Sequence, residues 1–336
     1  MSVLRPSRRP TMNDVAEAAG VSSATVSRVL NGKAWVAKET RESVLNAIAT
    51  TGYTANHQAR SLATGRSESV AFLLSAQVQD LFADPTFSQL LTGVVSALAD
   101  QDMTVVLLVA GTERERRQAA KFVKSGHVDG VIFVSPHEAD PTLKQLAESN
   151  MPLVSIGLPL GFQDLISSVS VDEVGSAMRA VEQLRARGCS RIAHIAGPLD
   201  TPGGKFREQG FLAIVGGEGC SLSVEGDWSV RSGREAMAQL LNLCPTIDGV
   251  FAASDSMAVG AMLEIQDRGL AVPDSVAVIG FDDSGLAEAA KPPLTTMRQP
   301  WTELSRLLVE LLLEQIDGAP MRRVTLPAEL VIRESA

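Results

Sequence analysis

The chain has 336 residues, 45% of them hydrophobic and 21% charged, and a net charge of −9. This composition permits a large buried core and excludes a disordered chain. No apolar run approaches the ~20 residues that cross a bilayer, and the basic N-terminus lacks the apolar run of a signal peptide. The three cysteines show no metal-binding spacing, which fits a reducing compartment. We therefore expect a cytoplasmic protein that uses no membrane, metal or cofactor.

The charge is distributed unevenly along the chain. Residues 1–66 contain nine Lys or Arg and four Asp or Glu, a net charge of +5, and the remaining residues carry −14. The overall charge alone would argue against nucleic acid. A basic segment on an acidic body instead predicts that this segment alone meets a polyanion.

Residues 11–50 show the pattern of three short helices. Thr11 and Asp14 have the spacing of a capping box at the start of the first helix. Gly20 permits a sharp turn after it, and Ser22 is placed to cap the second helix. A third helix is predicted from about residue 38 to residue 50. Two helices joined by a tight glycine turn form the helix-turn-helix signature.

The second predicted helix presents small and polar side chains near its N-terminus, together with one arginine. Hydroxyl groups hydrogen-bond to bases in either direction, and arginine suits guanine, so this face fits a major groove. The alternative is an ordinary three-helix bundle with a solvated polar face. The exposed residues are Ser23, Ala24, Thr25, Ser27 and Arg28.

Residues 11–67, and above all the segments DVAEAAGVS and ATVSRVLNG, resemble the DNA-binding head of the LacI/GalR (lactose/galactose repressor) family. The resemblance implies an operator-binding head over residues 1–55 and a hinge helix and linker over residues 56–66. Two residues depart from the family pattern. Ala37 removes a side-chain cap from the third helix, and Ala55 stands where a proline is usual.

The same resemblance implies which residues contact double-stranded DNA. In the family, the leucine that matches Leu62 enters the minor groove as an apolar wedge that kinks the duplex. The alternative for Leu62 is a linker residue packed on the body. The predicted DNA-binding residues are Thr11, Ser22, Ser23, Ala24, Thr25, Ser27, Arg28, Asn31, Tyr53, Asn56 and Leu62.

From residue 69 onward, apolar runs of strand length alternate with helical patterns. Continuous Val, Ile, Leu and Ala strands between helices predict parallel sheets covered on both faces. About ten strands exceed one comfortable sheet, so we expect two sheets in two lobes. Strands are predicted over residues 69–74, 104–109, 130–134, 153–156, 168–171, 191–196, 223–227, 249–252 and 275–280. Helices are predicted over residues 87–100, 114–124, 173–187, 231–243 and 256–268.

Polar side chains follow several of these strands, where parallel sheets bind their ligands. Arginine and aspartate can each bind two neighbouring hydroxyls, and an indole can stack on the C–H face of a sugar. Other interpretations stay open. Asp255 is also placed to cap the next helix, Trp228 to fill a lobe, and Arg207 to pair with Asp282 across an empty cleft.

The segments RIAHIAGPL, EGDWS, SDSMAVGAM, IGFDDS and PPLTTMRQP resemble the effector domains of the same family, which are similar to periplasmic sugar-binding proteins. The resemblance implies a two-lobed effector-binding and dimerisation domain over residues 67–336. The chain would cross between lobes near residues 168, 299 and 327. With no heptad tail after ELVIRESA, we expect a homodimer. The implied effector contacts are Ser75, Phe82, Arg207, Trp228, Ser254 and Asp282.

These observations predict an all-α helix-turn-helix head joined to an α/β, two-lobed, periplasmic-binding-protein-like domain with parallel sheets. The function expected is that of a transcription regulator, a repressor of carbohydrate-metabolism genes that binds a palindromic operator and responds to a sugar-like effector. A sugar-transport protein is the first alternative, but it would need an export signal and would leave residues 11–67 unexplained. An enzyme is the second, but the four histidines form no triad or metal pattern, so we expect no catalytic residues.

Overall fold

A computed structural model describes residues 10–30, 35–53, 66–77, 84–216 and 222–336. The chain divides into two compact units, Met1–Ser67 and Glu68–Ala336, and each is described by itself. Among the described residues, no helix is both long enough and apolar enough to cross a membrane. Part of the predicted hinge, residues 56–65, and four predicted contacts lie outside the described residues. These four are Asn31, Asn56, Leu62 and Phe82.

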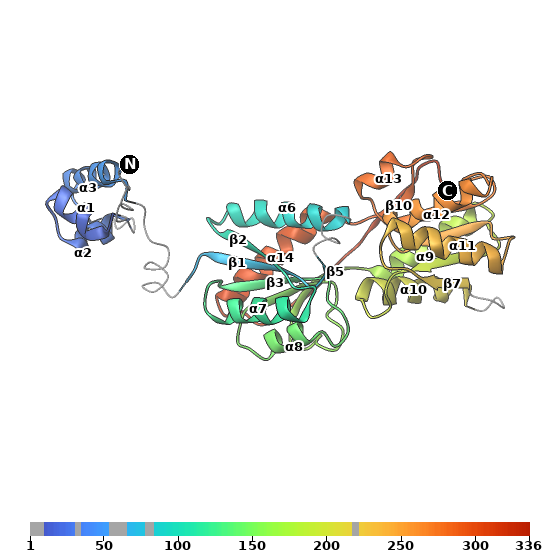
Figure 1. Ribbon diagram of the computed structural model, residues 1–336, viewed down its shortest axis with the longest axis horizontal. Helices are drawn as coiled ribbons and strands as arrows, with labels where there is room; N and C mark the ends of the chain where they lie inside the picture. The colour runs from blue at the N-terminus through green and yellow to red at the C-terminus, as the bar shows by residue number, and fades with distance from the viewer. Residues whose placement is uncertain (1–9, 31–34, 54–65, 78–83, 217–221) are drawn as a thin grey trace, which may run out of the picture. The chain divides into compact units, whose positions relative to one another are not determined.

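The first unit contains three helices, α1 (Met12–Ala19), α2 (Ser23–Leu30) and α3 (Lys38–Thr51), drawn in blue in Figure 1. The predicted capping box is confirmed, because the Thr11 amide donates to Asp14 over 2.6 Å and the Thr11 hydroxyl accepts from the Asp14 amide. Gly20 ends α1 in the left-handed region, with φ of 65°. The three helices bury one small core, made of Val15, Ala16, Val26, Val29, Val44, Ala47 and Tyr53.

The second unit contains two six-stranded sheets, which define two lobes. The first sheet has the strand order β11-β5-β4-β3-β1-β2, and every pair in it is parallel. Its strands are β1 (Ser69–Leu74), β2 (Thr104–Val109), β3 (Gly130–Val134), β4 (Leu153–Ile156), β5 (Ser167–Val171) and β11 (Arg323–Leu326).

The second sheet has the order β12-β10-β9-β8-β6-β7, and only its β10–β12 pair is antiparallel. Its strands are β6 (Ile192–Ala196), β7 (Leu222–Glu225), β8 (Gly249–Ala252), β9 (Ala277–Asp282), β10 (Thr295–Arg298) and β12 (Glu329–Val331). The two sheets and the helices around them confirm the predicted α/β fold class.

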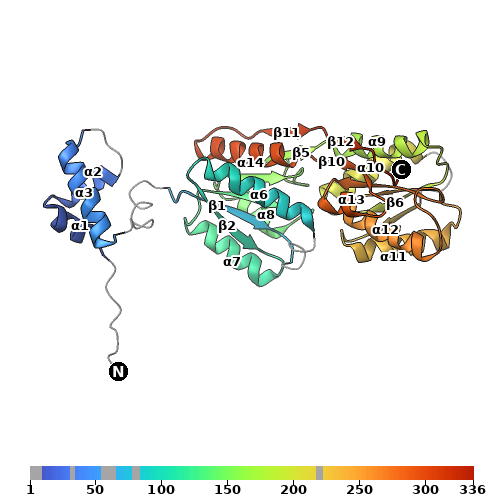
Figure 2. The ribbon, with the colours of Figure 1, turned by 90° about the horizontal axis from the view of Figure 1, so that it is seen from above.

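Helices cover both faces of each sheet. Successive side chains of β1 point to opposite faces, and both sets are buried. Phe72 and Leu74 pack with one group of helices, and Ala71 and Leu73 pack with another. Figures 1 and 2 show α6 and α14 on one side of the first sheet and α7 on the other. The helices of the first lobe are α6 (Pro85–Ala99), α7 (Glu113–Lys124), α8 (Pro141–Ala147) and α14 (Trp301–Ile316).

In the second lobe, α9 and α10 pack on one face of the sheet and α11 and α12 pack on the other. The chain passes between the sheets three times, after β5, after β10 and after β11. The helices of this lobe are α9 (Glu173–Ala186), α10 (Pro202–Val215), α11 (Val230–Leu243), α12 (Asp255–Asp267) and α13 (Gly285–Ala289).

Candidate functional site

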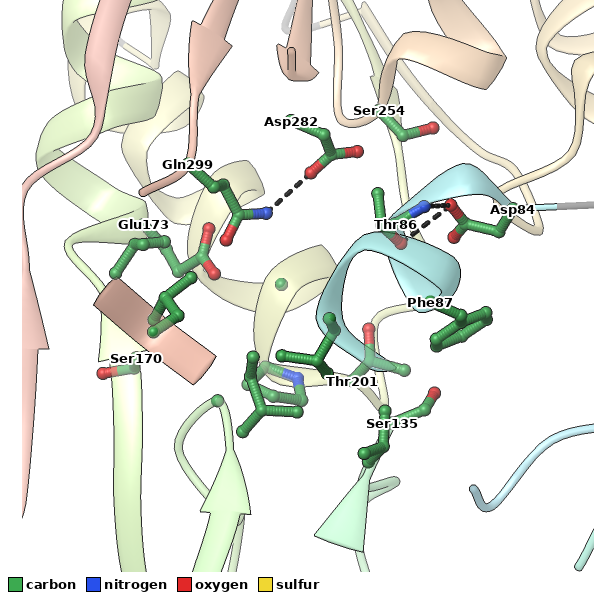
Figure 3. A pocket seen from close by; sticks show the side chains of 18 of the residues that line it. Asp84, Thr86, Phe87, Ser135, Ser170, Glu173, Thr201, Ser254, Asp282 and Gln299 are labelled. Atoms are coloured by element: carbon green, nitrogen blue, oxygen red, sulfur yellow. Dashed lines mark hydrogen bonds between the residues drawn. The ribbon is translucent and has the colours of Figure 1, made fainter. Parts of the chain in front are cut away.

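A pocket of about 850 Å³, including the part open to solvent, lies between the two lobes (Figure 3). Residues from both lobes line it, at or near the carboxyl ends of strands and the first turns of helices. This is where parallel sheets place their ligand sites. Its polar lining residues are Asp84, Thr86, Ser135, Ser170, Glu173, Thr201, Arg207, Ser254, Asp282 and Gln299.

Arg207 is the basic residue among the described residues of this lining, and its guanidinium group is buried. Its Nε donates to Glu173 Oε2 over 2.6 Å, and its Nη1 donates to the Ala253 carbonyl over 2.5 Å. The same Nη1 lies 3.6 Å from Asp282 Oδ1. Burial would lower the pKa of Arg207, but the carboxylates of Glu173 and Asp282 outweigh burial and raise it.

Asp282 ends β9 with a φ of 111°, a conformation that L residues rarely adopt. Gln299 Nε2 donates to Asp282 Oδ1 over 2.7 Å, and Trp301 Nε1 donates to the Asp282 carbonyl over 3.0 Å. Burial raises the pKa of Asp282 well above its usual range. Arg207 lowers that pKa in part, but Asp255 and Asp84 raise it further. The carboxyl group is therefore held at the pocket wall, as Figure 3 shows.

Arg207 and Asp282 do not form a bridge between lobes, contrary to one interpretation of the sequence. Both belong to the second lobe, because α10 and β9 pack in the same half of the unit. The two side chains therefore form one wall of the pocket. Glu173, at the start of α9, completes this wall.

Trp228 and Ser254 also line the pocket. Trp228 has a φ of 71°, and its ring lies against Gly197, where any side chain would collide with the indole. The Arg207 Cζ atom lies 5.7 Å from the centroid of the indole ring. Ser254 is the N-cap of α12, since its hydroxyl accepts from the Met257 amide over 3.2 Å.

Asp255 is neither the cap of α12 nor a residue of the pocket lining, which corrects both interpretations of the sequence. Its carboxylate is buried and accepts from the Ser284 amide over 2.7 Å and from the Thr296 hydroxyl over 2.6 Å. It therefore joins α12 to β10 and to the start of α13 inside the lobe. Burial, acting against these hydrogen bonds, raises the pKa of Asp255 to about 7.

The first lobe contributes a mainly apolar wall, with Phe87, Leu90, Val134 and Ile156. Ser75, a predicted effector contact, is not part of the lining. Its buried hydroxyl donates to Asp140 Oδ2 over 2.5 Å, and Asp140 caps α8. Asp84 is the N-cap of α6 and accepts from the Thr86 amide over 2.9 Å, as the dashed lines of Figure 3 show.

Two pairs of polar side chains join the two lobes beside the pocket, His137 with Asp200 and Lys205 with Glu138, and we call them the latch. His137 Nδ1 of the first lobe lies 2.8 Å from Asp200 Oδ2 of the second. Lys205 of α10 donates to Glu138 over 3.2 Å, and the Glu138 amide donates to the Asp200 carbonyl over 2.6 Å. All four side chains are more than a third exposed.

Sequence reasoning missed three charged or amide residues of the pocket: Asp84, Glu173 and Gln299. Glu173 follows β5 in the same way as the residues that were recognised, so the same rule could have found it. Gln299 follows β10, a strand that was absent from the predicted set. Asp84 is recognisable as a cap before Pro85, but its position in the pocket depends on the tertiary fold.

The first unit presents the predicted recognition helix α2 with exposed side chains at Ser22, Ala24 and Arg28. Ser22 accepts from the Thr25 amide over 3.2 Å, and the Ser23 hydroxyl donates to Asn13 over 2.7 Å. The first turn of α2 has no acidic residue, so the helix N-terminus can approach DNA without charge repulsion.

In this unit Tyr53 is buried, whereas Trp35 is exposed to solvent. Tyr53, a predicted DNA contact, is only 8% exposed and belongs to the core of the three helices. Trp35, which the sequence did not single out, is 66% exposed. The Arg28 Cζ atom lies 4.7 Å from the centroid of the Trp35 ring. This cation–π contact holds the guanidinium group of Arg28 over the indole.

A helix-turn-helix unit and a two-lobed pocket on one chain define a ligand-responsive DNA-binding protein. Residues 11–56 match the bacterial regulatory proteins of the lacI family, and residues 181–336 match the periplasmic binding protein-like domain. The HTH-type transcriptional regulator CelR of Thermobifida fusca is 39% identical over 98% of each chain. The ribose operon repressor of Halalkalibacterium halodurans is 35% identical over 97% of this chain and 96% of that one.

The chain therefore belongs to the LacI family of transcription regulators. Solved structures agree with this assignment along the whole length. A transcriptional regulator CelR–cellobiose complex has 38% identity and a TM-score of 0.78, covering 98% of this chain and 100% of that one. The lac repressor dimer bound to operator and the anti-inducer ONPF has 30% identity and a TM-score of 0.86, covering 98% and 99%.

Proposed function

We propose that the protein is a cytoplasmic repressor of carbohydrate-metabolism genes, which binds a palindromic operator as a dimer. A sugar or sugar-like effector in the pocket between the lobes sets its affinity for DNA, and the protein binds this effector without chemical turnover. The relatives that carry the names of a cellobiose complex and a ribose operon repressor support this assignment. A symmetric dimer presents two equivalent recognition helices, so its half-sites must mirror each other.

The observation that carries the proposal is the wall formed by Glu173, Arg207, Asp282 and Gln299 beside the Trp228 ring. Carboxylate, guanidinium and amide groups together offer the paired donors and acceptors that sugar hydroxyls need, and the indole offers a face for sugar C–H groups. The effector contacts proposed are Arg207, Trp228, Ser254 and Asp282, joined by Glu173 and Gln299.

The DNA contacts proposed are the exposed residues of α2 and its N-terminal turn, with Arg28 reading bases. The boundaries proposed are a head over residues 1–55, a connecting segment over residues 56–66 and an effector domain over residues 67–336. Leu62 as a minor-groove wedge stays a prediction from the family resemblance, since it lies outside the described residues.

Selection of binding sites from random DNA tests the proposal, and an inverted repeat is the expected product. Fluorescence anisotropy on that site, with a panel of sugars, then identifies the effector. Asp282→Ala should abolish the effector response and leave operator binding unchanged, because the hydrogen bonds between its carboxyl group and the ligand are lost. Asp164→Ala, at a side chain 91% exposed, is the control. Normal effector affinity in Asp282→Ala would contradict the site assignment but not the family.

A further inference from the structure

The pocket carries more negative than positive charge. Among the described residues, its lining includes the carboxylates of Asp84, Glu173 and Asp282 and the single guanidinium of Arg207. Three carboxylates and one guanidinium give a formal charge of −2 when all are ionised, and −1 when Asp282, whose pKa burial raises, holds a proton. In the sequence, residues 78–83, which lie outside the described residues, include no lysine or arginine.

Arg207 is already engaged by the protein. Two of its nitrogens donate to Glu173, a third position is taken by the Ala253 carbonyl, and Asp282 lies 3.6 Å from Nη1. The Arg207 Cζ atom also lies 3.6 Å from the centroid of the Phe281 ring. Swinging this group toward a bound anion would break a buried ion pair and leave Glu173 uncompensated, which is costly in a buried site.

The helix N-termini beside the pocket would by themselves attract an anion. Their first-turn amides, however, donate to caps of the chain itself. Thr86 donates to Asp84, Gly204 donates to Thr201 over 3.2 Å, and Met257 donates to Ser254 over 3.2 Å. At α6 the cap is itself a carboxylate, so the favourable end of that helix dipole already faces a negative charge.

The opposite wall suits an uncharged ligand with an apolar face. Phe87, Leu90, Val134 and Ile156 supply the apolar surface, and Ser135 and Ser170 add hydroxyl groups. Such a wall accepts sugar C–H groups and gives no compensation to a buried charge.

We propose that the effector is an uncharged glycoside or polyol, and that the pocket excludes phosphorylated and carboxylated sugars. The inference rests on the proposed function, in which this pocket binds a sugar. A phosphate ester carries about −1.5 to −2 charges at neutral pH. In the cleft it would meet the carboxylate of Asp84 and the carboxyl groups of Glu173 and Asp282. The basic residue of the described lining, Arg207, is already paired with Glu173, and water screens the charges less than at a surface.

Calorimetry on the full-length protein with matched pairs tests this exclusion. The pairs are glucose with glucose 6-phosphate, ribose with ribose 5-phosphate, and cellobiose with cellobiose 6′-phosphate. We expect at least one neutral sugar to bind, and its phosphate to bind at least about a hundredfold more weakly. The same pairs are then added to the protein–operator complex, where only the neutral member should change the affinity for DNA.

Asp84→Asn identifies the charge as the cause, because asparagine caps a helix as well as aspartate does. In this variant the ratio between the affinity for the neutral sugar and the affinity for its phosphate should fall by about tenfold, whatever the change in the affinity for the neutral sugar itself. Asp140→Asn is the matched control, since Asp140 also caps a helix before a proline, in the same lobe but outside the lining. Asp140→Asn should leave the ratio between the two affinities unchanged.

The other possible outcomes contradict the exclusion of phosphates, its electrostatic cause or the sugar response itself. A phosphorylated sugar that binds as tightly as its neutral partner overturns the inference and leaves the sugar response standing. If Asp84→Asn leaves the difference in affinity between the neutral sugar and its phosphate unchanged, the electrostatic cause is wrong. If neither member of any pair binds or changes DNA affinity, the proposed sugar response fails, and the inference fails with it.

Discussion

Arg28 lies exposed on α2, beside the ring of Trp35. If it contacts a base with both nitrogens, Arg28→Ala should weaken operator binding by about 1–3 kcal/mol and affect random DNA much less. Lys38→Ala, at an exposed residue of α3, should instead weaken binding to both DNAs, as a phosphate contact would. Anisotropy on operator and random DNA at two salt concentrations measures both effects. An equal loss on the two DNAs in Arg28→Ala would rule out base reading by this residue.

We expect Trp35 to act on DNA binding through Arg28, because its ring contacts the guanidinium group. Removing an exposed cation–π contact costs about 0.5–1 kcal/mol, so Trp35→Ala should weaken operator binding by that amount. In the Arg28→Ala background the same substitution should have no further effect. A double-mutant cycle on operator DNA gives the coupling. Equal losses in both backgrounds would show that Trp35 acts independently of Arg28.

Asp255 makes folding sensitive to pH, since burial raises its pKa from 3.8 to about 7. Between these values the folded protein holds a proton that the unfolded chain has released, so stability falls as pH rises through this window. Asp255→Asn carries no charge to bury. Its melting temperature relative to the natural protein should therefore improve from pH 5 to pH 8, as scanning calorimetry at both pH values would measure. A constant difference would contradict the raised pKa.

Single residues also show where sequence reasoning loses precision. The helix predicted from residue 256 begins at Asp255, so the cap moves to Ser254 and the carboxylate moves into the core. The partners of Asp255 are Ser284 and Thr296, which no local pattern connects to it. Ser75 lies outside the pocket lining, since its hydroxyl donates to Asp140, which is distant in the sequence. Residue types after strands were predictable, but their partners depend on tertiary contacts.

At the scale of elements, α3 begins without a side-chain cap. Its N-cap residue Ala37 has an extended backbone, with φ of −56° and ψ of 143°, and it is exposed. Ala37→Ser should add a hydrogen bond to a first-turn amide and stabilise the first unit by about 0.5–2 kcal/mol. Thermal unfolding followed by the helical circular dichroism of this unit measures the gain. Ala37→Val is the control, because valine brings no side-chain acceptor and is as poor an N-cap as alanine, and a similar gain from valine would contradict capping as the cause.

The strands were predicted best where the sequence has a nearly continuous apolar run. The predicted bounds of β1, β2, β3, β4 and β8 are confirmed, whereas β9 begins and ends two residues later than predicted. In contrast, β10 and β11 are four residues each and read TTMR and RVTL, so neither has the continuous apolar run that predicted the others.

The helix α10 was missed for a different reason. It contains Gly203, Gly204 and Gly210, and glycine disfavours helix when judged alone. In the fold, a side chain at Gly204 would collide with the Pro198 carbonyl, and one at Gly210 would collide with the Val174 carbonyl. The glycines therefore allow α10 to pack closely on its neighbours, which outweighs their low helix propensity.

At the scale of the whole effector unit, the latch should favour lobe closure. Exposed ion pairs contribute about 0–1 kcal/mol, so Lys205→Ala should weaken effector binding by up to about fivefold without touching the ligand. The effect should shrink at high salt. Calorimetry with the identified effector at two salt concentrations measures it. Lys144→Ala, at an exposed lysine of the first lobe, is the control.

The partner of Lys205 gives the decisive comparison. Glu138→Gln should weaken effector binding by a similar factor, and the double variant should be no weaker than either single variant. Additive losses would show that the two side chains do not act as a pair. The resemblance to the family predicted two lobes, but it did not predict this latch, because its four residues lie in loops and in a helix that the sequence did not reveal.

The order of the elements along the chain makes the folding of each lobe depend on the other. The first lobe receives α14 and β11 from the end of the chain, after the second lobe has been completed almost entirely. Leu308 and Leu312 of α14 are fully buried, and a side chain at Gly130 would lie 2.8 Å from Leu312. A fragment ending at residue 298 would therefore expose the core of the lobe made first. We therefore expect that neither lobe folds alone and that both lobes melt in a single cooperative transition.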